Sequence, residues 1–139
     1  MLRRPLLVLV AGSLAVVAAG CGGSGVQKPY TAQGTAPCLR DKGFTQVTTN
    51  AAKIGFIAGF AENGGLRAKA KDGNVLTIAF AADDTEGVAS TEKAFTRFAP
   101  KKLRPHINDI MESQGNAVLV WTITPTPTQL DDVKGCLSS

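Results

Sequence analysis

The alternation of apolar and polar positions between residues 44 and 123 predicts a succession of short strands and helices. Strands are expected over 44–49, 66–71, 75–81 and 117–123, and helices over 51–62 and from Asp83 or Asp84 to about Phe98. The strand at 66–71 is the clearest, because small or apolar residues alternate there with Arg67, Lys69 and Lys71. Asp72-Gly73-Asn74 directly after it predicts a hairpin turn into the next strand.

The second half of this region differs in its apolar spacing. The expected helix that ends at Phe98 carries a stripe of side chains spaced about one turn apart, Val88, Thr91, Phe95 and Phe98, which predicts that it packs on a sheet. Leu103, Ile107, Ile110 and Met111 lie in a segment broken by prolines and predict a short helical turn. The continuous apolar run 117–123 predicts a central strand that is buried on both faces.

One further helix is expected at each end of this unit. The first covers 35–43, with Thr35 as its N-cap, Pro37 in the first turn and Gly43 as its stop. The last begins at Thr126-Pro127, and Gln129 completes a capping box with Thr126. The order strand, helix, strand, strand, helix, strand between them is that of a ferredoxin-like βαββαβ unit. We therefore expect an α+β fold with a four-stranded antiparallel sheet and two helices on one face.

The first twenty residues have a different pattern. Arg3 and Arg4 precede an apolar stretch from Leu6 to Ala19 that only Gly12 and Ser13 interrupt. This stretch is shorter than the roughly 20 apolar residues that a membrane-spanning helix needs. A charged start, a short apolar run and small residues at its end predict a secretory signal peptide over 1–20.

The residues that follow the apolar stretch, Ala18-Ala19-Gly20-Cys21, resemble the lipobox of bacterial lipoproteins. The resemblance implies that the Cys21 thiol receives a diacylglyceryl group, that the chain is cut before Cys21, and that the new amino group can be acylated, for example with palmitate. Two or more acyl chains give stable anchoring, at about 0.8 kcal/mol per buried methylene. The resemblance therefore implies a protein held on the extracytoplasmic face of the cell membrane.

Composition divides the rest of the chain into a tether and one domain. Gly, Ser, Gln and Pro dominate 21–34 without an apolar period, which predicts a flexible tether, and 35–139 is the length of one small domain. Abundant Ala and Gly with 6% aromatic residues is typical of GC-rich genomes such as those of actinobacteria. The formal charge of +4 falls to about +2 without Arg3 and Arg4, so we expect no nucleic-acid partner.

The chain has 3 cysteines. Once Cys21 carries lipid, Cys38 and Cys136 remain, and export places them in an oxidising compartment. We therefore predict a disulfide between Cys38 and Cys136, which joins the two flanking helices. The alternatives are two buried free cysteines, or a disulfide that uses Cys21.

Residues that could carry catalysis or hold a metal form no recognisable motif. His106 is the single histidine, and a hydrolase built on it with Ser90 or Ser113 lacks a nucleophile elbow. The carboxylates Asp83-Asp84, Glu86 and Asp131-Asp132 are interpreted as first-turn helix residues that oppose the helix dipole. We therefore expect no enzyme, no metal and no cofactor, and an iron–sulfur cluster lacks the cysteines it needs.

Charge gathers at one place in the expected domain. Five cations crowd the end of the long helix and the loop after it: Lys93, Arg97, Lys101, Lys102 and Arg104. They are either a solvated helix end or a surface for anionic lipid headgroups or an acidic wall polymer. The sequence thus favours a non-enzymatic binding or interaction module of the cell envelope. An envelope hydrolase using His106, and an accessory subunit of an envelope complex, are the alternatives.

Overall fold

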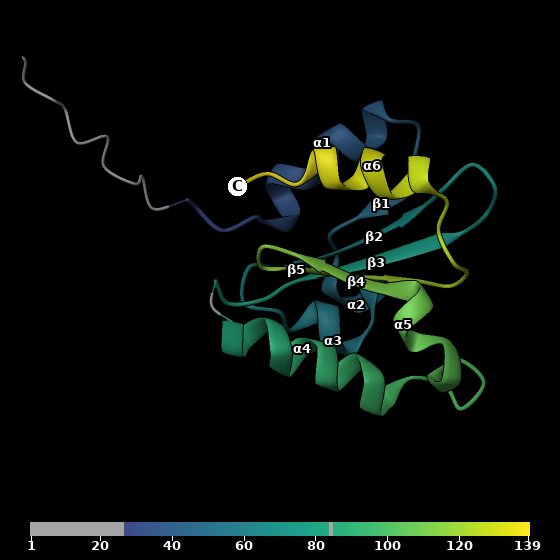
Figure 1. The fold of residues 1–139 in the computed structure, drawn as a ribbon. Helices are drawn as coiled ribbons and strands as arrows, with labels where there is room; N and C mark the ends of the chain where they lie inside the picture. The colour runs from purple at the N-terminus through teal and green to yellow at the C-terminus, as the bar shows by residue number, and fades with distance from the viewer. Residues whose placement is uncertain (1–26, 84) are drawn as a thin grey trace, which may run out of the picture.

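The computed structural model describes residues 27–83 and 85–139. The predicted signal peptide and Cys21 lie outside the described residues. The elements follow one another as α1 (Ala32–Asp41), β1 (Thr45–Thr48), α2 (Ala51–Ile54), α3 (Phe56–Gly59), β2 (Gly65–Lys69), β3 (Val75–Phe80), α4 (Thr85–Phe98), the 3₁₀ turn η1 (Arg104–His106), α5 (Ile107–Ile110), β4 (Met111–Gln114), β5 (Ala117–Trp121) and α6 (Pro127–Cys136) (Figure 1).

The strands form a five-stranded antiparallel sheet in the order β1-β2-β3-β5-β4. The register places Arg67, Thr77 and Val120 side by side across β2, β3 and β5, and Met111 follows on β4. The predicted α+β class with an antiparallel sheet is confirmed. Ala117, Val118, Leu119 and Trp121 are buried, so β5 is an inner strand as its apolar run predicts. It ends at Trp121, however, and Ile123, within the predicted span, is 64% exposed.

The finer prediction of a ferredoxin-like topology is not confirmed. In that topology the third strand of the βαββαβ unit lies between the first and the second. Here β1 pairs directly with β2. The reason lies in the segment between them, where Gly55 divides the helix expected over 51–62 into α2 and α3, of 4 residues each. Helices about 6 Å long return the chain to the neighbouring strand and do not carry it across the sheet.

Helices cover both faces of the sheet (Figure 1). The helices α1 and α6 lie on one face, which we call the disulfide face, and α2, α3 and α4 lie on the opposite face, which we call the groove face. On the disulfide face, Leu76, Ile78 and Trp121 pack in one cluster with Leu39 of α1 and Val133 of α6, all at most 1% exposed. Full burial of each such side chain contributes roughly 1.5–3 kcal/mol.

The groove face is less well covered. Its small cluster consists of Ile54, Ala58 and Ala79, and Phe95 of α4 packs beside them half-buried. Although α4, with 14 residues, is the longest helix in the described part of the chain, none of its residues is buried. The apolar stripe of α4 therefore points to the sheet, as predicted, but does not close over it.

Two further local predictions need correction. Met111 was expected in a helical turn, but it has extended backbone angles and begins β4, where it pairs with Val120. The N-terminal helix begins at Ala32, because the Thr31 hydroxyl and not that of Thr35 accepts a hydrogen bond from a first-turn amide, that of Gly34 (3.0 Å). The helix therefore takes up the last residues of the expected tether, 21–34. Thr35 is instead buried inside the helix.

Candidate functional site

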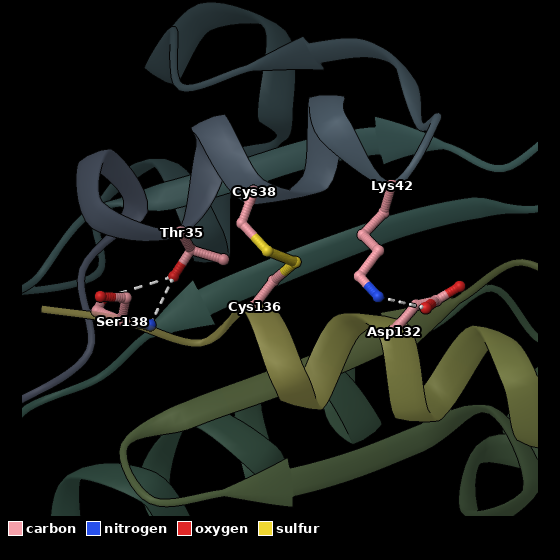
Figure 2. Close-up of a disulfide and its surroundings, with 6 residues drawn as sticks. All are labelled: Thr35, Cys38, Lys42, Asp132, Cys136 and Ser138. Atoms are coloured by element: carbon pink, nitrogen blue, oxygen red, sulfur yellow. Dashed lines mark hydrogen bonds and ion pairs between the residues drawn. A yellow bond between two sulfur atoms is a disulfide. The ribbon is translucent and has the colours of Figure 1, made fainter.

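The disulfide face carries the predicted cysteine pair. Cys38 of α1 and Cys136 of α6 form a disulfide, with their Cα atoms 5.4 Å apart (Figure 2). Figure 2 shows two further links close to the disulfide: Lys42 pairs with Asp132 at 3.1 Å, and the Thr35 hydroxyl accepts a hydrogen bond from the Ser138 amide (3.2 Å). These contacts hold α1, α6 and the C-terminal residues together, so the cysteine pair belongs to the framework of the fold.

Within the predicted basic cluster, the contacts of Arg104 differ from those of the other four cations. Arg104 donates from Nε to the carbonyl of Ala99 (2.9 Å) and from a terminal nitrogen to the carbonyl of Arg97 (3.2 Å). Arg104 thus satisfies carbonyls at the end of α4, which is a capping role. The remaining cations, Lys93, Arg97, Lys101 and Lys102, are exposed and form no ion pair among the residues that the structure describes.

An apolar groove lies beside this cluster, between α2–α3 and α4. Its volume is about 510 Å³, within the roughly 300–1,000 Å³ of small-molecule sites. The residues around it are Ile54, Gly55, Phe56, Ile57, Ala58, Thr77, Phe95, Phe98 and Val120. Thr77 and Val120 belong to the sheet and make the floor, while α2–α3 and α4 make the walls.

Aromatic side chains mark the rim of this groove. Phe56 is 77% exposed and Phe98 66% exposed. Phe60, outside the groove lining, is 80% exposed and contacts Phe56 with ring centres 5.0 Å apart and ring planes tilted by 49°. The Arg97 guanidinium lies 5.7 Å from the centre of the Phe98 ring. The described domain therefore presents three exposed phenylalanines, and Arg97 of the basic cluster lies beside one of them.

The helix α4, which forms one wall of the groove, is hydrogen-bonded to the edge strand of the sheet. Glu92 accepts a hydrogen bond from the Ser113 hydroxyl of β4 (2.5 Å), which ties the helix to the edge strand of the sheet. Toward the middle of the sheet the helix meets Thr77 and Val120, whose short side chains leave space below Phe95 and Phe98. The break at Gly55 places Phe56 on the rim of the same space.

A separate cationic hollow lies beside the groove, toward β1, and is lined by other residues. It has a volume of about 360 Å³ and is lined by Lys53, Arg67 and Lys69 together with residues of β1 and β3. Arg67 is the cross-strand partner of Thr77, which lies on the groove floor, and Lys53 directly precedes Ile54 of the groove wall. Within the described residues none of the three cations forms an ion pair.

The residues considered for catalysis do not converge. His106 is exposed, and its nearest charged partner is Asp109, at 3.7 Å. No hydrogen bond joins His106 to Ser90 or Ser113 within the described chain.

The acidic residues also lie apart from one another. Glu86 lies in the first turn of α4, as predicted, but the prediction for Asp131 and Asp132 is wrong, because no acidic residue lies in the first turn of α6. Over residues 27–83 and 85–139, no three His, Cys, Asp or Glu side chains are close enough to share a metal ion. Over the same residues, the helices lack the length and apolar character that crossing a bilayer requires.

Reasoning from the sequence did not find the groove or the hollow. The apolar stripe of α4 predicted that the helix packs on the sheet, and the alternation over 66–71 placed Arg67 and Lys69 on one face of a strand without assigning them a role. Two features of the sequence could have indicated the site: Gly55, which interrupts the helical spacing, and two phenylalanines, Phe56 and Phe60, on so short a segment. Comparison of the chain with family models, with curated proteins and with solved structures found no match in any of the three.

Proposed function

We propose that this protein is an extracytoplasmic lipoprotein, anchored in the cell membrane through lipid on Cys21, whose domain is a non-enzymatic binding module for the anionic lipid surface of the envelope. Ala18-Ala19-Gly20-Cys21 after the apolar stretch supports the anchor. The disulfide between Cys38 and Cys136 is in keeping with an oxidising compartment outside the cytoplasm.

The observation that carries the binding role is the combination of exposed phenylalanines and unpaired cations around α3 and the end of α4. Near an anionic membrane each cation contributes about 1 kcal/mol, and aromatic side chains insert at the boundary between headgroups and acyl chains. A polyanionic wall polymer would account for Lys101 and Lys102 but would leave Phe56, Phe60 and Phe98 in water. The phenylalanines therefore favour lipid over polymer.

The anchor permits this contact. Tyr30 is fixed to the domain by Asn116, which leaves nine residues from Cys21 to Pro29 as the connection. Such a segment reaches at most about 30 Å when fully extended. A domain of this size has a radius of gyration of about 13 Å, so the groove face can turn to the membrane.

Lipidation is the first prediction. The wild-type protein extracted from membranes should begin at Cys21 and carry the mass of its acyl chains, as intact-mass spectrometry will measure. Cys21→Ala should accumulate as an unprocessed chain without lipid, because the modified thiol is what licenses cleavage. A wild-type chain that retains residues 1–20 and has no acyl mass would refute the anchor.

The basic cluster gives the second prediction. A soluble form that begins at Gly22 retains every described helix and strand, so its co-sedimentation with phosphatidylglycerol vesicles isolates the contribution of the domain. Lys101→Gln with Lys102→Gln should weaken this binding about 30-fold at low salt, from about 1 kcal/mol for each cation, while leaving the melting temperature unchanged. High salt should reduce wild-type binding, because the screening length falls from about 10 Å at 0.1 M to about 3 Å at 1 M.

Two control variants also remove one cation each. Lys71 lies away from the cluster, and Arg104 has a structural role at the end of α4. Lys71→Gln removes an exposed cation of the β2–β3 turn and should bind vesicles nearly as the wild type does. Arg104→Gln should lower the free energy of unfolding by about 1 kcal/mol, because it removes the bonds that Arg104 donates to the end of α4. Equal sedimentation with phosphatidylcholine and phosphatidylglycerol vesicles would contradict the binding role.

A further inference from the structure

The groove on the sheet leaves a large apolar area in contact with water. Four aromatic or branched side chains, Phe56, Ile57, Phe95 and Phe98, face a space of about 510 Å³ without filling it. Apolar surface that is contiguous and rimmed by polar groups is typical of ligand grooves and interaction sites. The polar side chain that lines it is that of Thr77, so an occupant of the groove meets few hydrogen-bonding groups.

One end of the groove is positively charged. Arg67 lies opposite Thr77 in the register of β2 and β3, and its guanidinium donates to the carbonyl of Lys53 at 3.5 Å. Lys69 lines the same hollow. Three cations without carboxylate partners in the described chain thus stand where the apolar floor ends. This arrangement is complementary to a molecule with an apolar tail and an anionic head.

We propose that the groove binds the acyl chain of an anionic lipid, with the chain between α3 and α4 and the headgroup at Lys53, Arg67 and Lys69. This inference rests on the proposed function, because the membrane surface would supply the lipid. It goes further in that a single lipid molecule occupies a defined site away from Lys101 and Lys102.

Two other occupants fit the groove less well. A peptide segment would bring backbone amides and carbonyls into a space whose walls are mostly apolar, where unpaired polar groups are costly. A second copy of this chain, packed face to face on a two-fold axis that runs along the groove, would bring its own Lys53 and Arg67 toward those of the first copy. Like charges at such an interface oppose association. An acyl chain needs no hydrogen bonds, and its headgroup neutralises the cations.

The test uses the mature lipidated chain in phosphatidylcholine vesicles. The probe is lysophosphatidylglycerol with a photoreactive diazirine on its acyl chain, and a monoacylglycerol with the same labelled chain is the uncharged control. After irradiation, mass spectrometry of peptides locates the label. We expect label on the segments 54–57, 95–98 and 120, and at least fivefold more of it from the anionic probe.

Variants distinguish the site for the acyl chain from the site for the headgroup. Thr77→Phe, and independently Val120→Phe, place a ring on the groove floor and should reduce labelling at least fivefold while the domain keeps its cooperative thermal transition. Lys53→Gln with Arg67→Gln should reduce labelling by the anionic probe to the level of the uncharged one. Lys71→Gln is the matched charge control and should label as the wild type does.

Several results would overturn the inference. These are label confined to Phe60 and the tether, equal labelling by both probes, or a Thr77→Phe chain that folds and labels as the wild type does. A dimer in native mass spectrometry that both floor variants abolish would assign the groove to a second copy. The proposed function is tested separately. If the groove takes no label but Lys101→Gln with Lys102→Gln still weakens vesicle binding by the soluble form, only the groove inference fails.

Discussion

At the scale of single residues, Asn116 joins three parts of the domain through one buried amide. Its side-chain oxygen accepts a hydrogen bond from the amide of Tyr30 (2.8 Å), and its nitrogen donates to the carbonyls of Tyr30 (2.9 Å) and Ala81 (3.0 Å). The side chain is 1% exposed, so water cannot replace these bonds. The Tyr30 ring lies over Gly115, where a Cβ atom would come within 2.7 Å of it.

The third prediction therefore concerns Asn116. Replacing it with alanine removes three hydrogen bonds and leaves the amide of Tyr30 and the carbonyl of Ala81 without these partners, so Asn116→Ala should lower the free energy of unfolding by about 2–3 kcal/mol. Urea titration followed by circular dichroism measures this. Asn108→Ala, at an exposed position of α5, is the control and should change it by less than about 0.5 kcal/mol. Similar values for the two variants would contradict the role of Asn116.

At the scale of elements, the break between α2 and α3 decides the shape of the groove face. Gly55 has φ 90° and ψ 162°, a conformation that residues with a Cβ atom rarely adopt. Asn50 caps α2 by accepting a hydrogen bond from the Ala52 amide (3.0 Å), and a second short helix then starts at Phe56. The turn at Gly55 is what places Phe56 and Ile57 at the groove.

The fourth prediction compares two glycines with equal space around them. A Cβ atom would meet nothing within 4 Å at either Gly55 or Gly135, but only Gly55 has a positive φ. Gly55→Ala should therefore lower the free energy of unfolding by about 1–3 kcal/mol through backbone strain alone. Gly135→Ala, inside α6, should raise it by about 0.5–1 kcal/mol.

Thermal and urea unfolding of the two variants will check these opposite signs. Gly55→Ala should also change labelling of the groove by the lipid probe, because Phe56 moves with the backbone. A Gly55→Ala variant as stable as the wild type would contradict the prediction, because it would show that the backbone at this position relaxes without loss of stability.

At the scale of the whole molecule, the two faces of the sheet are built differently. The disulfide face is closed by α1 and α6, which the Cys38–Cys136 bond and the Lys42–Asp132 pair hold together. The groove face has a helix with no buried residue and an open apolar space. A rigid side opposite an open side suits a domain that must remain folded while a ligand enters and leaves.

The fifth prediction concerns the disulfide. Cys38 and Cys136 are 98 residues apart in sequence, and closing a loop of about that length stabilises a protein by at most about 4.7 kcal/mol in the chain-entropy model. Reduction should therefore lower the melting temperature markedly, and the double variant Cys38→Ser, Cys136→Ser should melt at the reduced value with or without reductant. Two reactive thiols in the unreduced, denatured soluble form would refute the bond.

The sequence by itself determined the features that depend on neighbouring residues. Thr126 and Gln129 form the predicted capping box, because all its atoms belong to one turn of chain. The turn after β2 also forms as predicted, with Asp72 accepting from the amide of Asn74 (2.9 Å). The cysteine pairing was predicted from the lipobox resemblance, which assigns Cys21 to lipid and leaves Cys38 and Cys136 for each other, and the structure pairs these two.

The tertiary structure alone decided which strands pair and where the sheet stays open. β4 has little apolar character, and Met111–Gln114 is a strand because β5 offers it an unpaired edge. Thr77 and Arg67 became neighbours of the groove through the register of β2 and β3, and Phe98 through the position of α4. These contacts join residues far apart in the chain, and their geometry depends on the packing of the whole sheet, so local patterns do not encode them.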